Sequence, residues 1–327
     1  MATKVILDCD TGVDDTMAIL LAALHPDIDL LAVGSVWGNV DAPLATRNSI
    51  HTLEMCGRDD IPVAMGASAP INQRPQDIAY FVHGRDGQGN RGTGRPVGSP
   101  VPGTAAEQIV RVCRAHPGEV EIIAVGPLTN LALALGLDPE LPRVARGVTI
   151  MGGTALAPGN VSEVAEANIW HDPEAAAAVF NAPWRVTLVG LDVTMRTLLH
   201  PGHLERLRSG GTIAQYLSRI MEFYTDFCAR ESFGEPLTTM HDALAVAIGA
   251  DVWEPTLAPL VRARVDTSDG PGRGQTLCDL RGMYRGYPAQ DDARCRVVLD
   301  CDTRFGDTFV DLILAAGDAA IDVSEPG

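Results

Sequence analysis

The sequence contains no apolar stretch long enough to cross a membrane. Its longest uninterrupted apolar run, Met17 to Leu24, has eight residues, whereas a transmembrane helix needs about 20. Strand-like residues begin at Val5, directly after the first four residues, which leaves no room for a signal peptide. We therefore expect a cytoplasmic protein with no membrane partner.

Metal-binding cysteine pairs and an excess of basic charge are also missing. The seven cysteines are scattered and form no Cys-x-x-Cys, which argues against a structural zinc site and a disulfide framework and fits a reducing cytoplasm. The 25 Lys and Arg residues face 42 Asp and Glu residues, a formal net charge of −17. Such a charge repels nucleic acids and anionic membranes. It is compatible with a small sugar-bearing substrate or with a cation bound by some of the acids.

Short apolar, β-rich runs alternate with Ala- and Leu-rich helical stretches along the chain. This alternation predicts βαβ units and a mostly parallel sheet with both faces covered by helices. No linker divides the 327 residues, so we predict a single α/β domain over residues 1–327. Strands are expected at Val5–Leu7, Leu30–Gly34, Ile61–Met65, Val120–Val125, Val148–Met151 and Val186–Leu191, and helices at Asp14–Leu24, Ala42–Cys56, Thr104–Ala115, Thr129–Leu137, Pro173–Phe180, Thr212–Ala229 and His241–Ala250.

Two segments rich in glycine and aspartate interrupt this alternation. The first, Asn72–Gly103, also contains several prolines and arginines and is predicted to be a long loop. The second is Asp266–Gly274. Because long loops in compact domains are more often functional than idle, we expect the first segment to contribute to a site.

A dense acidic cluster follows the first predicted strand. Asp8, Asp10, Asp14 and Asp15 lie between an apolar strand and an apolar helix, with Gly12 permitting a tight turn between them. In open α/β sheets the ligand crevice lies at the carboxyl ends of the strands. One helix cap accounts for only one or two of these acids. A bound divalent cation is the simplest source of compensating charge, and oxygen-only ligands favour Ca²⁺ or Mg²⁺.

Several motifs together resemble the inosine–uridine-preferring nucleoside hydrolase family. The acidic cluster matches its signature, Asp8-x-Asp10-x-Gly12-x-Asp14-Asp15. Further matches follow in the family's order over residues 5 to about 310: Trp37-Gly38-Asn39, His83-Gly84-x-Asp86-Gly87-x-Gly89, Val125-Gly126-Pro127-Leu128-Thr129-Asn130, Met151-Gly152-Gly153, Glu166-Ala167-Asn168, Asp172-Pro173-Glu174-Ala175-Ala176 and His241-Asp242-Ala243. The family's loop usually reads Asp-Gly-Leu-Gly. Gln88 replaces the Leu here, and we expect this change to affect loop closure.

The resemblance implies a fold, a reaction and a cofactor. The fold is a single-domain, open, mostly parallel sheet flanked by helices, with a Rossmann-like core. The reaction is hydrolysis of the N-glycosidic bond of a ribonucleoside to free base and ribose, as used in nucleoside salvage. The cofactor is one Ca²⁺, for which the resemblance implies the carboxylates of Asp10, Asp15 and Asp242 and the backbone carbonyl of Val125 as ligands.

The resemblance also implies roles in catalysis and substrate binding. Asp10 would take a proton from the attacking water, and His241 would protonate the departing base. A ribose bound by many hydrogen bonds would be strongly preferred over 2′-deoxyribose. The residues implied to bind the substrate are Asp14 and Asn39 on the 2′ and 3′ side, Asn160, Glu166 and Asn168 on the 3′ and 5′ side, Met151, and His83 and Tyr224 around the base.

Two other functions remain open at this point. A phosphatase would use Asp8 as a nucleophile together with Mg²⁺, and a nucleoside sensor would keep the pocket without turnover. Phosphate release without ribose release would identify the first, and binding without a reducing-sugar product would identify the second. The preference for purine or pyrimidine bases is undetermined, and we expect a homo-oligomer, either a dimer or a tetramer.

Overall fold

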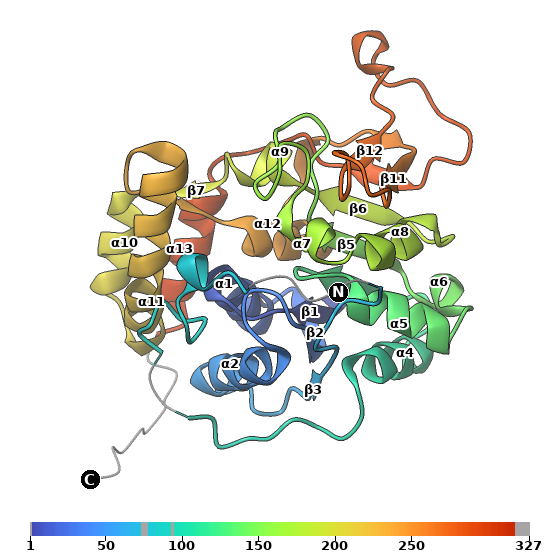
Figure 1. The fold of residues 1–327 in the computed structure, drawn as a ribbon. Coiled ribbons are helices and arrows are strands. Elements are labelled where there is room, and N and C mark those ends of the chain that lie inside the picture. Colours follow the sequence, from blue (N-terminus) through green and yellow to red (C-terminus); the bar gives the residue numbers. More distant parts are fainter. Residues whose placement is uncertain (1, 73–77, 93–94, 318–327) are drawn as a thin grey trace.

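A computed structural model describes residues 2–72, 78–92 and 95–317. They form an α/β fold around an eight-stranded sheet (Figure 1). Every neighbouring pair of strands in this sheet is parallel except the pair at one edge. The order is β10 (Leu260–Val261), β13 (Cys295–Val297), β6 (Val186–Val189), β5 (Gly147–Met151), β4 (Val120–Ala124), β1 (Thr3–Cys9), β2 (Ile28–Ser35) and β3 (Val63–Met65).

Helices cover both faces of the sheet because the central strands are apolar on both sides. In β1, Val5 and Leu7 point into one buried cluster and Ile6 into another, since side chains alternate along a strand. The first face is covered by α1 (Val13–Leu24), α2 (Ala42–Met55), α10 (Pro201–Arg208), α11 (Thr212–Cys228), α12 (His241–Gly249) and α13 (Phe305–Ala315). The second is covered by α4 (Ala105–Ala115), α5 (Thr129–Leu137), α6 (Leu141–Val144) and α8 (Pro173–Asn181).

Shorter elements surround this core. In the described ranges, three short helices, one π-helical turn, one 3₁₀ turn and three two-stranded sheets connect the larger elements. They are α3 (Tyr80–His83), α7 (Ala167–His171), α9 (Leu191–Thr194), the π-helix Ala229–Phe233, the 3₁₀ turn Met283–Arg285, and the strand pairs β7 (Leu198–Leu199) with β8 (Thr238–Thr239), β9 (Pro255–Leu257) with β14 (Asp300–Cys301), and β11 (Ala263–Val265) with β12 (Thr276–Cys278).

The structure confirms the predicted fold class and every predicted strand and helix, with ends shifted by at most two residues. The prediction of one uninterrupted loop over residues 72–103 is wrong in part, because α3 lies within it; residues 73–77 and 93–94 are outside the described part. Strands β10 and β13 escaped prediction because two or three residues carry no clear alternation. A domain spanning residues 1–327 stays a prediction, since residues 318–327 are also outside the description.

The carboxyl ends of β1, β2, β4 and β5 meet at one edge of the sheet, because these neighbouring strands are parallel. Helix α1 leaves this edge directly after β1, and α12 packs against α1. The motifs found in the sequence therefore converge here. Across the residues with described positions, no helix combines the length and the apolar character that crossing a membrane requires.

Candidate active site

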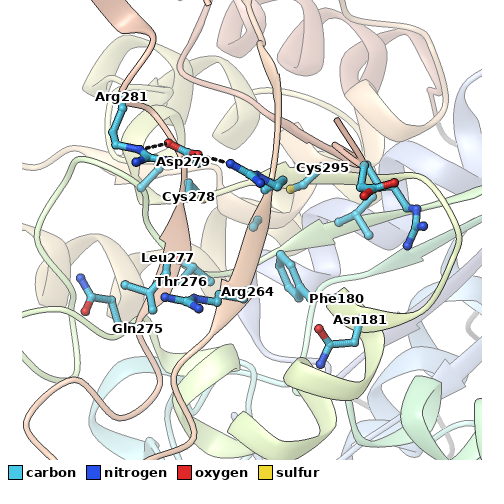
Figure 2. Close-up of a pocket in the computed structure, with 16 residues that line it drawn as sticks. Phe180, Asn181, Arg264, Gln275, Thr276, Leu277, Cys278, Asp279, Arg281 and Cys295 are labelled. Atoms are coloured by element: carbon cyan, nitrogen blue, oxygen red, sulfur yellow. Dashed lines mark hydrogen bonds and ion pairs between the residues drawn. The ribbon is translucent and has the colours of Figure 1, made fainter. Parts of the chain in front are cut away.

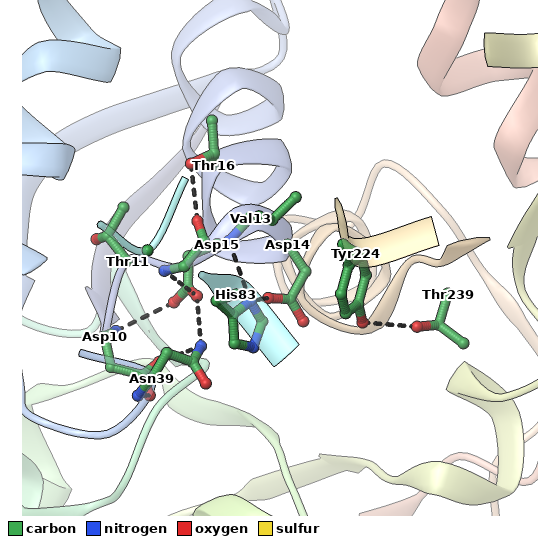
Figure 3. A network of polar contacts seen from close by, with 12 residues as sticks. Asp10, Thr11, Val13, Asp14, Asp15, Thr16, Asn39, His83, Tyr224 and Thr239 are labelled. Atoms are coloured by element: carbon green, nitrogen blue, oxygen red, sulfur yellow. Dashed lines mark hydrogen bonds and ion pairs between the residues drawn. The ribbon is translucent and has the colours of Figure 1, made fainter. Parts of the chain in front are cut away.

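Three buried carboxylates from two helices meet at this edge. Asp14 and Asp15 lie in the first turn of α1, and Asp242 lies in the first turn of α12. Each offers one carboxylate oxygen, and the three oxygens lie within 4.8 Å of one another. The predicted ligand set named Asp10 in place of Asp14. Asp10 lies in the turn between β1 and α1, next to Asp15 (Figure 3).

Local hydrogen bonds explain how the turn places these acids. The Asp15 carboxylate accepts the backbone N–H groups of Asp10 (3.0 Å) and Gly12 (2.8 Å), so it caps the start of α1. Asn39 follows β2 and donates its backbone N–H to Asp10 at 2.7 Å. The Asn39 side-chain amide also donates to Asp10 (3.3 Å) and to Asp15 (3.0 Å). Asn39, predicted as a sugar-binding residue, thus connects two carboxylates in this structure.

The charge of the acidic cluster is not balanced by a basic side chain among the residues that the structure describes. Within the described ranges, no Lys or Arg side chain forms an ion pair with Asp10, Asp14, Asp15 or Asp242. Burial raises the pKa of Asp14 and of Asp15 to about 6. Burial, followed by repulsion from Asp14, Asp15 and Asp10, holds the pKa of Asp242 well above its ordinary range. Asp14 Oδ1 and Asp242 Oδ2 are buried without a hydrogen-bond partner, which leaves both available to a bound cation.

His83 is the basic side chain that approaches the cluster. Its Nδ1 accepts the backbone N–H of Val13 at 3.2 Å and lies 3.7 Å from Asp14 Oδ1. Its ring stacks on Tyr224, with centroids 5.4 Å apart and planes inclined by 20°. Burial lowers the pKa of His83 to about 4, so the ring is neutral at pH 7 and does not balance the carboxylates.

Tyr224 and His241 are each held by a threonine. The Tyr224 hydroxyl is within 2.7 Å of Thr239 Oγ1, and the His241 Nδ1 is within 2.7 Å of Thr194 Oγ1. Burial, followed by the nearby His83, lowers the pKa of His241 to about 4. This value is below the ordinary histidine pKa of 6.5. The neutral imidazole still carries one N–H that it can donate.

A third group of predicted residues surrounds the ends of β4 and β5. The Asn168 amide donates to the backbone carbonyls of Val125 (2.8 Å) and Met151 (3.2 Å). The buried Glu166 carboxylate accepts the backbone N–H groups of Gly153 (2.7 Å) and Asn168 (2.9 Å). Burial raises the pKa of Glu166 to about 7. Glu166 therefore both caps α7 and contributes to the charge near Asp242.

Asn160 differs from the other predicted site residues. It is exposed, and its side-chain oxygen accepts the backbone N–H of Ala167 at 3.0 Å. Among the interactions of the described residues, none joins Asn160 to the buried carboxylates. Most of the predicted site residues thus lie in one cluster: Asp10, Asp14, Asp15, Asn39, His83, Tyr224, His241 and Asp242. Four more lie beside it: Val125, Met151, Glu166 and Asn168. Asn160 remains on the loop that precedes α7.

Asp8 points away from this cluster. It is fully buried against the second face of the sheet, where the Asn130 amide donates to it at 2.8 Å. A Cβ on Gly34 would lie 2.5 Å from Asp8 Oδ1 and 3.0 Å from the Ala105 Cβ. A phosphate group cannot approach Asp8 in this position, so the structure disfavours the hypothesis of a phosphatase with Asp8 as its nucleophile.

Two contributing residues were missed in the sequence, Thr194 and Thr239, which hold His241 and Tyr224. Gln88, which the sequence singled out, joins the glycine-rich segment to α1. Thr239 directly precedes the Met240-His241-Asp242 motif, a position that offered a usable signal. Thr194 lies in α9 with no motif around it, so only packing reveals its role.

Comparisons with known proteins show which family this chain resembles in sequence and fold. A family model described as inosine-uridine preferring nucleoside hydrolase matches residues 5–311. A probable uridine nucleosidase 2 of Arabidopsis thaliana is 40% identical over 288 residues, which cover 87% of this chain and 85% of the relative. The inosine-uridine preferring nucleoside hydrolase of Leishmania major is 35% identical over 326 residues, covering 97% and 99% of the two chains. The solved purine-preferring ribonucleoside hydrolase of Gardnerella vaginalis superposes with a TM-score of 0.88 at 28% identity, covering 97% and 100%.

Proposed function

The chain belongs to the inosine-uridine preferring nucleoside hydrolase family and is an enzyme that cleaves N-glycosidic bonds of ribonucleosides, and from this premise we propose that its activity depends on Ca²⁺ held by the acidic cluster. In this proposal it acts in the cytoplasm as a homo-oligomer, and its products, free base and ribose, serve nucleoside salvage.

The observation that carries the calcium proposal is the uncompensated charge at the end of β1. Buried carboxylates meet there without an arginine or lysine partner among the described residues, and two of their oxygens lack any hydrogen bond. Ca²⁺ prefers oxygen ligands, including backbone carbonyls. The proposed ligands are Asp10, Asp15 and Asp242 together with the Val125 carbonyl, which keeps a second lone pair beside its bond from Asn168. When bound, Ca²⁺ supplies positive charge that attracts water and substrate hydroxyls.

The residues around the cluster suit a reaction with an oxocarbenium-like transition state. Asp10 takes the proton of the attacking water, and Asn39 holds that carboxylate in place through its backbone and side-chain N–H groups. The carboxylates of Asp14 and Glu166 stabilise the positive charge that develops on the sugar ring. In its protonated, imidazolium form His241 donates a proton to the departing base and returns to the neutral ring, while His83 and Tyr224 present a stacked aromatic pair to the base.

Ribose is held by the polar groups on both sides of the carboxylates. Asp14 and Asn39 bind the 2′ and 3′ side, and Glu166 and Asn168 the 3′ and 5′ side. Met151 and Asn160 belong to the same side of the site in this proposal. A missing 2′-hydroxyl would leave buried polar groups unpaired, so ribonucleosides are preferred over 2′-deoxyribonucleosides. The relatives are named for uridine, for inosine and uridine, and for purines, so both base classes are candidate substrates.

The decisive experiment measures product release with and without calcium. The enzyme is incubated with inosine, uridine, 2′-deoxyuridine and p-nitrophenyl phosphate, and free base, reducing sugar and phosphate are each measured. We expect base and ribose from the ribonucleosides, loss of activity after treatment with a chelator selective for calcium, and recovery with Ca²⁺. Recovery with Mg²⁺ alone would contradict the calcium assignment. Nucleoside binding without reducing sugar would contradict turnover and support a sensor.

A further inference from the structure

The carboxylate of Asp192 accepts three consecutive backbone N–H groups. Asp192 lies in the first turn of α9. Its Oδ2 accepts the N–H of Ala155 at 2.7 Å, and its Oδ1 accepts those of Leu156 at 2.6 Å and Ala157 at 2.9 Å. Hydrogen bonds to an ionised carboxylate are about twice as strong as those between neutral groups. Asp192 therefore fixes the bend of residues 155–157, which lies between β5 and α7.

The bend held by Asp192 borders a cleft. Ala155 and Thr276 line this cleft, which has a volume of about 740 Å³ (Figure 2), and the Leu156 side chain is 58% exposed. Thr276, in β12, accepts the backbone N–H of Thr154 at 2.8 Å and donates its hydroxyl to the Thr154 carbonyl at 2.5 Å. Because open space lies on one side of the bend, its position depends on the hydrogen bonds to Asp192 and Thr276 as well as on packing.

The bend is connected to a residue of the proposed ribose site. Gly153, two residues before the bend, donates its N–H to Glu166 Oε2 at 2.7 Å. The Gly153 carbonyl accepts the N–H of Leu191, the residue before Asp192, at 3.0 Å. A Cβ on Gly153 would be 2.6 Å from Thr276 Cγ2, so the backbone before the bend is in close contact with α9 and with β12. A shift of the bend therefore moves one of the N–H groups that orient the Glu166 carboxylate.

The same helical turn also holds the proposed acid. Thr194, two residues after Asp192, has its Oγ1 2.7 Å from His241 Nδ1. A Cβ on Gly190, which directly precedes α9, would lie 2.7 Å from the Gly153 carbonyl oxygen. The helix α9 thus packs closely on the end of β5 and lies between the sugar side and the base side of the proposed site. A substrate altered only on its sugar therefore distinguishes the role of Asp192 from that of Thr194.

We propose that Asp192 is a positioning residue for the sugar side of this site. Its carboxylate holds the bend, the bend holds Gly153, and Gly153 orients the Glu166 carboxylate toward the 5′ side of the ribose. Asp192 acts through these backbone groups, because both of its carboxylate oxygens already accept N–H groups from the bend. The inference rests on the proposed role of Glu166 in binding the 3′ and 5′ side of the sugar.

The test compares uridine with 5′-deoxyuridine, which lacks the hydroxyl that Glu166 would bind. Asp192→Asn replaces one acceptor oxygen by an NH₂ group, so at least one N–H of the bend loses its partner. Using the full chain with Ca²⁺, we expect kcat/KM for uridine to fall by about tenfold, mainly through a higher KM, and kcat/KM for 5′-deoxyuridine to change much less. The ratio of the two kcat/KM values should therefore fall by almost the same factor.

The matched control is Asp138→Asn. Asp138 also accepts a backbone N–H, from Glu140 at 3.1 Å, but it lies at the end of α5 on the second face of the sheet, so this variant should keep the ratio of the unmodified protein. Thermal unfolding of each variant checks that the fold is retained. If Asp192→Asn does not fold, Thr276→Val tests the same bend, because it removes the hydroxyl that holds Thr154, and it should lower the ratio in the same direction.

An unchanged ratio in Asp192→Asn, whether from equal losses on both substrates or from no loss, would overturn the proposal, because general damage to the fold affects the two substrates alike. The unmodified enzyme separates this failure from that of the proposed function. If it hydrolyses uridine and 5′-deoxyuridine equally well, Glu166 does not bind the 5′ side and both proposals fail. If it prefers uridine and Asp192→Asn keeps that preference, only the role of Asp192 fails.

Discussion

His83 and Gly12 lie so close that no side chain fits between them. A Cβ built on Gly12 would be 2.7 Å from His83 Nδ1 and 3.0 Å from the Asn39 amide nitrogen. Both neighbours belong to the proposed site, and both are fixed by hydrogen bonds to the start of α1 or to its acids. The glycine of the acidic motif is therefore required by close approach, in addition to the tight turn that the sequence indicates.

Replacing Gly12 by alanine should displace His83 and Asn39 without unfolding the protein. Because a misplacement of about 1 Å at a catalytic site costs about 100-fold in rate, we expect Gly12→Ala to lower kcat/KM for uridine by about that factor. Gly136→Ala is the matched control, since a Cβ there meets no atom within 4 Å. A Gly12→Ala enzyme with ordinary activity would show that His83 and Asn39 do not need these positions.

Gln88 should prove to be a positioning residue for the glycine-rich segment. Its amide nitrogen donates to Thr16 Oγ1 (3.0 Å) and to the Gly12 carbonyl (3.2 Å), and its oxygen accepts the Tyr216 hydroxyl (2.8 Å). Because these bonds join the segment that carries His83 to α1 and α11, we expect Gln88→Leu to raise the KM for uridine more than it lowers kcat.

A double-mutant cycle of Gln88→Leu with Tyr216→Phe, measured by urea unfolding, tests the same contacts energetically. We expect a coupling energy of about 1 kcal/mol, and none in the control cycle with Tyr284→Phe, whose ring is 93% exposed. Additive effects in the Tyr216 cycle, together with an unchanged KM, would remove Gln88 from this role.

Asp242→Asn should weaken calcium binding. The substitution removes a negative charge and alters the buried Oδ2, which has no hydrogen-bond partner. Since the number of charged ligands tunes calcium affinity, we expect the dissociation constant of Ca²⁺, measured by calorimetry, to rise by about tenfold or more. Asp8→Asn is the control and should leave the constant unchanged, because Asp8 lies on the other face of the sheet. Similar losses in both variants would argue against a site at Asp242.

His241→Ala should affect substrates with poor leaving groups most. Loss of a general acid costs about 100-fold or more when the leaving group needs a proton. We expect a loss of that size for inosine and a much smaller one for p-nitrophenyl riboside, whose leaving group departs as a stable anion. The ratio of the two kcat/KM values is the measurement, and equal losses on both substrates would contradict the acid role.

Glu121 should make the fold less stable as the pH rises. Burial raises the pKa of this carboxyl to about 7, opposed by the hydrogen bond from Thr149 at 2.8 Å. Because the folded pKa exceeds the unfolded value of 4.5, the stabilising contribution is complete below pH 4.5 and is lost as the pH rises through about 7.

Glu121→Gln removes this ionisation. The advantage of the variant in free energy of unfolding should therefore grow by about 2.5 kcal/mol between pH 5 and pH 8. Urea unfolding at both pH values is the measurement, with the exposed Glu231→Gln as control. A difference that does not depend on pH would show that Glu121 titrates normally in the folded state.

Much of the fold could be predicted because its signals are local. The apolar run of β1 and the helical periodicity of α1 each lie within a few residues, and their order along the chain implies a parallel sheet with helices on both faces. The prediction missed short elements such as β10, β13 and α3, and also the helices α10 and α13. Those elements form because neighbouring chain segments pair with them or pack on them, which no local pattern records.

The grouping of most candidate site residues was predictable to a similar extent. The motifs identified the acids, the histidines and Asn39, and the structure brings these together. The exposed position of Asn160 was not predictable, because it depends on the hydrogen bonds that Asn160 forms with Ala165 and Ala167 in the folded loop before α7. The close contact of Asp14 with Asp15 and Asp242 also depended on packing.

The sequence by itself determined that acidic side chains follow the first strand and begin the first helix, because adjacent residues cannot be separated by folding. Only the tertiary structure decided that Asp242 completes the carboxylate cluster, that Thr194 holds His241 and that Gln88 fastens the glycine-rich segment. Each of these contacts joins residues far apart in the chain. They form because α1, α11 and α12 bury their apolar faces against one another and against the sheet, and this packing fixes the side chains at their ends.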